Sequence, residues 1–314
     1  MNALVTGATG FAGQPLVRRL LSHGGQVTAI VRPGSPYRNS LPQHTRLTIV
    51  EADLDDLEQW PSILGSSHAD VFYHLAWKDV RTGNRNDVTQ VSNIEPAVKS
   101  VALAREMGCG CWIGVGSQAE YGVLNRRISE DDPVNPTTIY GASKLAACML
   151  AQIVGRQVGI RTVWIRIFSA YGPGDRSKRL LDYVIENLLE RKKPLLTAGE
   201  QLWDYIYIDD VVEALVAVAL AEQASGIYNV GSGQARVLRS VVEELRDMID
   251  PHLPLGFGEK PYKADEVMHL EADIEKIIKD TGWQPSVPLS RGLRVLVDEY
   301  MRQGRPAVRV PARE

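Results

Sequence analysis

The sequence predicts an α/β protein with a doubly wound parallel sheet and a smaller, mixed α/β domain towards the C-terminus. Short runs rich in β-branched residues alternate with segments of helical periodicity through the first half of the chain. A G-x-x-G-x-x-G spacing over residues 7–13 separates the first such run from the first helical segment. Strand–helix alternation of this kind winds a parallel sheet with helices on both faces.

Composition narrows the possible functions. The 314 residues are 44% hydrophobic and 23% charged, as in ordinary globular proteins. The net charge of −3 offers no basic excess for nucleic acid, and no apolar run reaches membrane-spanning length. Met1 leads directly into the first predicted strand, so we expect no signal peptide and a cytoplasmic protein. Cys109, Cys111 and Cys148 match neither a disulfide framework nor a metal site, so we expect reduced thiols and no metal.

The glycine-rich segment predicts a phosphate-binding turn. Residues 3–5 form the expected strand, and a helix begins near Phe11. Gly7 permits a tight turn, Gly10 lets a phosphate approach the backbone, and Gly13 lets the helix pack closely on the sheet. The free N–H groups and dipole of the helix then favour an anion. The expected contacts are Gly7, Thr9, Gly10, Phe11, Ala12 and Gly13.

The end of the second predicted strand, 26–31, bears on the choice of cofactor. In a dinucleotide fold an acidic residue here binds the ribose 2′-OH, whereas an arginine accommodates a 2′-phosphate. No Asp or Glu occurs over 27–39, but Arg32 and Arg38 do. The sequence therefore favours NADP(H), with NAD as the alternative if Arg32 is only a solvated loop residue.

Further candidates follow the next strands, predicted over 47–50, 69–76 and 111–115. Ligands of parallel sheets bind beyond the carboxyl ends of the strands, where Ser117 also lies. Asp53 either accepts from the adenine amino group or caps a helix that begins at Asp55. The expected cofactor contacts in these segments are Asp53, Leu54, Leu75, Ala76 and Lys78.

Tyr140 and Lys144 lie at i and i+4 in a predicted helix over 138–158, and so share one face. A nearby ammonium lowers the pKa of a phenol, because the cation favours the phenolate. Such a tyrosine can exchange a proton near neutral pH. The alternative, a surface aromatic beside a surface lysine, is weakened by Ser117 and the glycine turn upstream.

Residues 1–303 resemble the extended short-chain dehydrogenase/reductases, which comprise nucleotide-sugar epimerases, dehydratases and ketoreductases. The matching segments are residues 6–13, 74–76, 117–122, 140–144, 166–174, 201–211, 228–231 and 282–285. The resemblance implies a Rossmann domain over 1–170, to which 203–226 return, and a substrate domain of 171–202 and 227–303. Residues 304–314, with two prolines and no periodicity, are predicted to be a mobile tail.

The resemblance also implies residue roles. Ser117 would hydrogen-bond the sugar oxygen, Tyr140 would transfer the proton, and Lys144 would hold the ribose hydroxyls and lower the tyrosine pKa. Asn93, on a helix predicted over about 84–107, would support the proton relay. This helix and the one over 138–158 would pair with a second subunit, which makes a homodimer the expected assembly. The candidates for the nucleotide-sugar site are Ser117, Gln118, Tyr140, Ser169, Arg179, Gln201 and Trp203.

Departures from the family pattern narrow the reaction. The 4,6-dehydratases carry acidic residues directly after the serine or threonine, whereas Gln118 and Ala119 can act as neither acid nor base. Ala119 likewise disfavours a decarboxylase or a fucose-synthase type. Two possibilities remain: NADPH-dependent reduction of the 4-keto group of a nucleoside-diphosphate 4-keto-6-deoxy sugar, favoured by Arg32, and an NAD-dependent nucleotide-sugar 4-epimerase. A non-catalytic dinucleotide-binding sensor is a remote third, since such proteins usually lose the tyrosine or the lysine.

Overall fold

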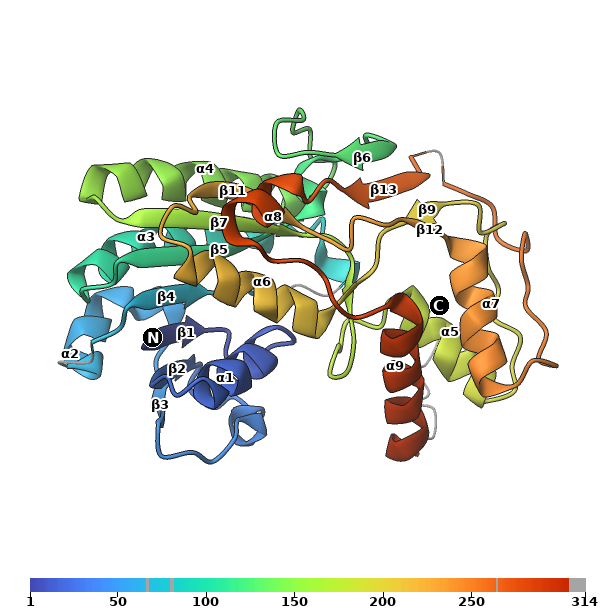
Figure 1. The fold of residues 1–314 in the computed structure, drawn as a ribbon, viewed down its shortest axis with the longest axis horizontal. Helices are drawn as coiled ribbons and strands as arrows, with labels where there is room; N and C mark the ends of the chain where they lie inside the picture. The colour runs from blue at the N-terminus through green and yellow to red at the C-terminus, as the bar shows by residue number, and fades with distance from the viewer. Residues whose placement is uncertain (66–67, 80–81, 264, 305–314) are drawn as a thin grey trace.

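A seven-stranded parallel sheet forms the centre of the computed structural model, which describes residues 1–65, 68–79, 82–263 and 265–304 (Figure 1). The strand order is β11-β7-β5-β4-β1-β2-β3, and every neighbouring pair is parallel. The doubly wound sheet predicted from the sequence is therefore confirmed. Its strands are β1 Ala3–Thr6, β2 Val27–Val31, β3 Leu47–Glu51, β4 Val71–His74, β5 Cys111–Ser117, β7 Arg161–Ile167 and β11 Gly226–Val230.

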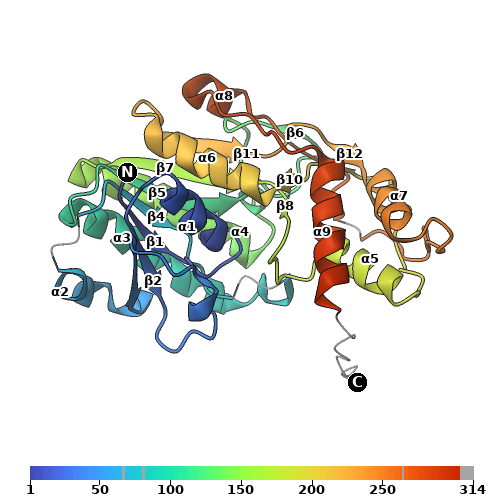
Figure 2. The same ribbon diagram turned by 60° about the horizontal axis from the view of Figure 1, so that its bottom comes forward.

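Helices cover both faces of this sheet. Successive strand side chains point to opposite faces, so Val5 packs in one apolar cluster and Leu4 in the other. The Val5 cluster includes α1 (Gly13–Ser22) and α6 (Ile208–Leu220), which Figure 2 shows lying together over the sheet. The Leu4 cluster takes its helical side chains from α2 (Trp60–Leu64), α3 (Ile94–Glu106) and α4 (Ile139–Val158).

The smaller part of the chain lies beside the carboxyl ends of the strands of the large sheet (Figure 1). It holds a four-stranded sheet in the order β12-β9-β13-β6 and a two-stranded one, β10-β8. The strands are β6 Arg126–Ile128, β8 Ala170–Tyr171, β9 Leu202–Trp203, β10 Ile206–Tyr207, β12 Arg236–Val237 and β13 His269–Ala272. The remaining helices are α5 Leu180–Leu189, α7 Leu238–Ile249, α8 Glu275–Thr281 and α9 Leu289–Gln303, of which α7 and α9 bury one apolar stripe each.

Four segments differ from the sequence-based expectation. The helix predicted over 84–107 begins only at Ile94, because Asp87 caps a separate 3-10 helix over Val88–Asn93. The strand predicted over 194–198 is a single bridge between Leu195 and Gly256. Strand β11 belongs to the large sheet, whereas the predicted division assigns 227–230 to the substrate domain. Strand β6, within the predicted Rossmann domain, pairs with β13 in the smaller sheet. The tail predicted over 304–314 lies, beyond Gly304, outside the described residues.

The expected pairing of α3 and α4 with a second copy stays a prediction. On α4, the described chain exposes three large apolar side chains: Met149 (58%), Leu150 (43%) and Ile153 (42%). Exposed apolar side chains grouped on one helix are typical of an interaction surface.

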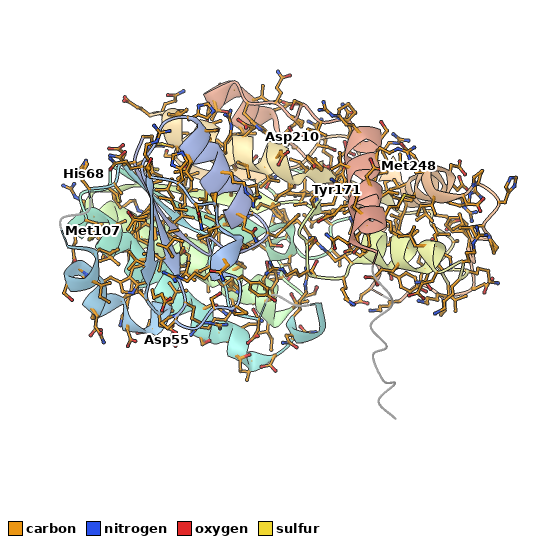
Figure 3. All side chains as sticks on the ribbon, turned by 90° about the horizontal axis from the view of Figure 1, so that it is seen from below. Asp55, His68, Met107, Tyr171, Asp210 and Met248 are labelled. Atoms are coloured by element: carbon orange, nitrogen blue, oxygen red, sulfur yellow. The ribbon has the colours of Figure 1, made fainter. Side chains whose placement is uncertain are left out.

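Two buried aspartates connect segments that are distant in the sequence. The Asp210 carboxylate, in the first turn of α6, accepts hydrogen bonds from Ser286 and from the Val287 N–H. Tyr171 donates to the Leu289 carbonyl at 3.1 Å, and Figure 3 shows Tyr171 beside α9. Asp204 accepts from both the N–H and the hydroxyl of Ser232, from Gly233 N–H and from Ala272 N–H.

We predict that Asp204→Ala lowers the free energy of unfolding by about 3 kcal/mol, because it leaves buried donors without an acceptor. Chemical denaturation monitored by circular dichroism measures this change. The matched control is Glu275→Ala, whose carboxylate is largely exposed, and we expect it to change stability by less than about 0.5 kcal/mol. Equal midpoints for the two variants would contradict the prediction.

Candidate functional site

The turn after β1 leaves no room for a Cβ at two of its glycines. Gly7 has a φ of 66°, and a Cβ there would lie 2.7 Å from the Ala76 nitrogen. At Gly13 a Cβ would lie 2.1 Å from the Gly7 carbonyl oxygen, so α1 could not pack where it does. A Cβ at the exposed Gly10 would be 3.0 Å from the same oxygen. The close packing therefore requires glycine at positions 7 and 13 for steric reasons.

The N-terminus of α1 can receive an anion. No side chain caps this helix and its first turn holds no acidic residue, so its first N–H groups have no competing carboxylate within the described chain. Thr9, Phe11 and Ala12 are partly exposed beside it. The steric requirements and the uncapped helix fit a dinucleotide pyrophosphate.

The carboxyl end of β2 is rich in cations. Arg32 is exposed and has no carboxylate partner among the residues that the structure describes. Arg38 instead pairs with Glu51 at 3.4 Å, and the Arg176 guanidinium stacks 3.5 Å above the Tyr37 ring. Arg32 is thus the arginine at this strand end that remains available to a ligand phosphate.

The segments after β3 and β4 are held by their own hydrogen bonds. Asp53 accepts from Asp55 N–H, which is the helix-capping alternative, and is followed by Leu54 at the start of a 3-10 helix. The Lys78 ammonium contacts both carboxylate oxygens of Asp55, at 2.7 and 2.6 Å.

Asn93 holds in place the segment that follows β4. It is 4% exposed and forms two hydrogen bonds with the Lys78 backbone, accepting from N–H at 2.5 Å and donating to the carbonyl at 3.3 Å. Ala76 N–H donates to the Thr6 hydroxyl, and Leu75 packs against the apolar cluster of Val5. In this structure Asn93 therefore fixes the position of the 75–78 segment.

A buried carboxylate supports Ser117. Ser117, at the end of β5, accepts from Ala119 N–H and donates its own N–H to Glu120 at 2.8 Å. Glu120 is fully buried and also accepts from Trp164 Nε1 at 3.0 Å and Arg166 Nε at 2.8 Å. The sequence alone did not identify Glu120 or Trp164 as supporting residues; the arginine at 166 within an apolar strand was the available signal.

The helix that carries Tyr140 and Lys144 packs directly on the segment after Ser117. Thr138 caps α4 by accepting from Gly141 N–H, and a Cβ at Gly141 would lie 2.4 Å from the Ala119 carbonyl. The buried Lys144 ammonium donates to the Val115 carbonyl at 2.6 Å and lies 3.6 Å from the centre of the Trp77 ring. Burial lowers the pKa of Lys144 to about 7, although the Glu120 charge opposes this change.

Tyr140 has a higher pKa than a free tyrosine. Burial raises it, while the Arg85 charge and a hydrogen bond with Ser117 act in the opposite direction. Desolvation outweighs the nearby charges in this arrangement, and the lowering of the Tyr140 pKa by Lys144 stays a prediction. Arg85, which the sequence analysis missed, is instead the cation that acts most strongly on the phenol.

A cavity of about 570 Å³ lies between the two parts of the molecule. Ser117 and Tyr140 line one side, and residues of the smaller part line the other. All of the predicted substrate residues lie on its wall: Ser117, Gln118, Tyr140, Ser169, Arg179, Gln201 and Trp203. Within this wall Trp203 Nε1 donates to the Ser169 hydroxyl at 2.7 Å, and Arg179 pairs with Asp175.

No group of three or more potential metal ligands occurs among the described residues. Over the same residues, no helix combines the length and hydropathy needed to cross a bilayer.

Comparison with known proteins identifies the family. The sequence profile of the NAD-dependent epimerase/dehydratase family matches residues 3–231, more than half of the chain. The chain belongs to this family. Among curated relatives, it is 26% identical to the dTDP-glucose 4,6-dehydratase of Escherichia coli, covering 96% of this chain and 93% of that one. It is 24% identical to the dTDP-4-dehydro-6-deoxyglucose reductase of Escherichia coli, with coverages of 94% and 96%.

A solved family structure is similar over nearly the whole length. The UDP-glucuronic acid 4-epimerase of Bacillus cereus, in complex with UDP-glucuronic acid and NAD, superimposes with a TM-score of 0.84 and is 25% identical. The alignment covers 96% of this chain and 99% of that one. The family comparison thus confirms the Rossmann-type fold and includes dehydratases, reductases and epimerases among the relatives.

We predict that Lys144→Met stabilises the protein at neutral pH by about 2 kcal/mol, because it removes a titratable group that is costly to keep charged when buried. Since the pKa of Lys144 is lowered, the unfolded wild type binds the extra proton between about pH 7 and pH 10, and wild-type stability rises through this range. The advantage of the variant should therefore shrink as pH rises. Urea denaturation at several pH values tests this, with the exposed Lys279→Met as control; a constant difference would contradict it.

Proposed function

We propose that this protein uses NADPH to reduce the 4-keto group of a nucleoside-diphosphate 4-keto-6-deoxy sugar. The observation that carries the proposal is Arg32, an exposed arginine at the carboxyl end of β2 that has no carboxylate partner among the described residues. A 2′-phosphate would match its charge, and NADP(H) suits an enzyme that takes up reduced cofactor at each turnover. Residues 7–13 would hold the pyrophosphate, and the cavity between the two parts of the chain would hold the nucleotide sugar.

The side chains support a proton-transfer role for Tyr140. The bound cofactor would supply a hydride to sugar C4. Tyr140 would donate its phenolic proton to the C4 oxygen, while the Ser117 hydroxyl donates a hydrogen bond to the same oxygen. Lys144 would hold the carboxyl end of β5 in place through the Val115 carbonyl and offer its remaining protons to the ribose hydroxyls.

The residues around Ser117 favour this reaction over elimination of water. Gln118 lines the cavity next to Ser117 but carries no acidic group. The nearest acidic residue in sequence, Glu120, is 0% exposed and bound to Arg166 and Trp164. It is thus unavailable as an acid or base for a dehydratase-type step.

A nucleotide-sugar 4-epimerase is the second candidate. The Bacillus cereus structure, which carries NAD, is an epimerase of the same architecture. In such a reaction Tyr140 would first accept and then return the proton of the C4 hydroxyl. Both candidates use the same residues, so the cofactor distinguishes them.

We predict that the purified protein binds NADPH more tightly than NADH and contains no co-purified NAD. Arg32→Asp should weaken NADPH binding about tenfold and improve NADH binding, because it removes a charge-assisted contact with the 2′-phosphate. Fluorescence titration with both cofactors measures this, with Arg105→Asp, exposed near the end of α3, as control. Tightly retained NAD and indifference to NADPH would instead support the 4-epimerase.

We predict that Tyr140→Phe reduces turnover of a 4-keto sugar nucleotide at least about 100-fold, because the proton donor is lost. NADPH affinity should stay within about twofold of wild type. Absorbance of NADPH at saturating substrate gives the rate, and fluorescence gives the affinity. Normal turnover in the variant would rule out Tyr140 as the proton donor.

A further inference from the structure

Arg85 lies against the reacting tyrosine. Its guanidinium carbon is 5.2 Å from the centre of the Tyr140 ring, within the range of a cation–π contact. The Arg85 carbonyl accepts the Tyr140 N–H at 2.8 Å, so backbone and side chain both hold the two residues together. Arg85 and Tyr140 line the same cavity as Ser117.

Among the described residues, no carboxylate neutralises the charge of the Arg85 guanidinium. Its Nε atom is buried without a hydrogen-bond acceptor, and no carboxylate pairs with the group among the described residues. A buried guanidinium N–H normally finds an oxygen acceptor. Here the Tyr140 ring is the electron-rich group beside the guanidinium, so its charge acts directly on the phenol.

Lys144 is differently placed. Its ammonium is engaged by the Val115 carbonyl and by the face of the Trp77 ring. The Trp77 indole is in turn fixed by Gln90, which accepts from Nε1 at 2.8 Å. Since an arginine stays protonated throughout the working pH range, Arg85 provides a permanent charge where Lys144 does not.

We propose that Arg85 is a positioning residue that stabilises the Tyr140 phenolate during proton transfer, acting through the tyrosine and not on the substrate. The inference rests on the proposed role of Tyr140. When the phenolic O–H bond breaks and its proton passes to the sugar oxygen, the negative charge left on the ring is stabilised by the guanidinium above it. The same contact favours the phenolate in the reverse direction, when Tyr140 accepts a proton.

Other charged groups also face Tyr140 and set the background for this effect. Glu120, behind Ser117, disfavours the phenolate, whereas Arg179, at the start of α5, favours it. Lys144 follows one turn later on α4. Arg179 is already paired with Asp175, which leaves Arg85 as the unpaired cation in contact with the phenol ring.

The experiment measures the ionisation of residue 140 directly. Difluorotyrosine is incorporated at position 140 of the full chain, where its fluorines make the phenol more acidic and report ionisation by fluorine NMR. The pH titration is run for the parent protein and for Arg85→Met, Arg85→Lys and Asn86→Ala. Asn86 is the matched control, because it ties the same loop to α4 by accepting Ile139 N–H but carries no charge.

We expect Arg85→Met to make the phenol at least about tenfold weaker as an acid, since an opposite charge at this distance typically lowers a pKa by one or more. Arg85→Lys should restore most of the acidity, and Asn86→Ala should leave it unchanged. An Arg85→Met titration that overlaid the parent curve, or an equal change in Asn86→Ala, would overturn the proposal. The titration needs no substrate, so its outcome is separate from that of Tyr140→Phe turnover, which tests the proposed function.

Discussion

The Glu120–Arg166 ion pair connects the reacting edge of the large sheet to the rest of the molecule. Glu120 receives the Ser117 N–H, and Arg166 Nε reaches it from the neighbouring strand β7. The Arg166 guanidinium stacks 4.4 Å above the Tyr121 ring, and the Tyr121 hydroxyl donates to Asn229 on β11. A buried pair of this kind contributes little net stability, because desolvation offsets the attraction, but it disfavours arrangements that separate the charges. We attribute the fixed position of Ser117 to this pair.

The same network also connects the large sheet to the smaller one. Asn229 donates to the Ile128 carbonyl on β6, a strand of the smaller sheet, and its own N–H donates to Glu130. Strand β6 in turn pairs with β13. These hydrogen bonds therefore connect β11 of the large sheet to β6 and β13 of the smaller one.

Sequence patterns predicted the features that depend on local geometry. Glycine at positions 7 and 13, the β-branched runs of the strands and the Tyr140–Lys144 spacing each follow from neighbouring residues alone, and the sheet confirmed the alternation. All the predicted substrate residues also line one cavity, with Ser117 following from the rule that ligands bind beyond the carboxyl ends of parallel strands. What the sequence could not predict is contact across long separations: Glu120 with Trp164, or Arg85 with Tyr140.

Those long-range contacts change the electrostatics expected of the site. The i, i+4 spacing suggests that an ammonium acts on a phenol, but the Lys144 ammonium donates to the Val115 carbonyl. Burial lowers the pKa of Lys144 to about 7. The permanent charge near Tyr140 comes instead from a loop more than fifty residues earlier in the chain. Across the cavity, Trp203 is paired with Ser169 and Arg179 with an aspartate, so much of the polar surface there is internally satisfied. Among the described residues Arg85 has no carboxylate partner, so its charge remains to act on Tyr140.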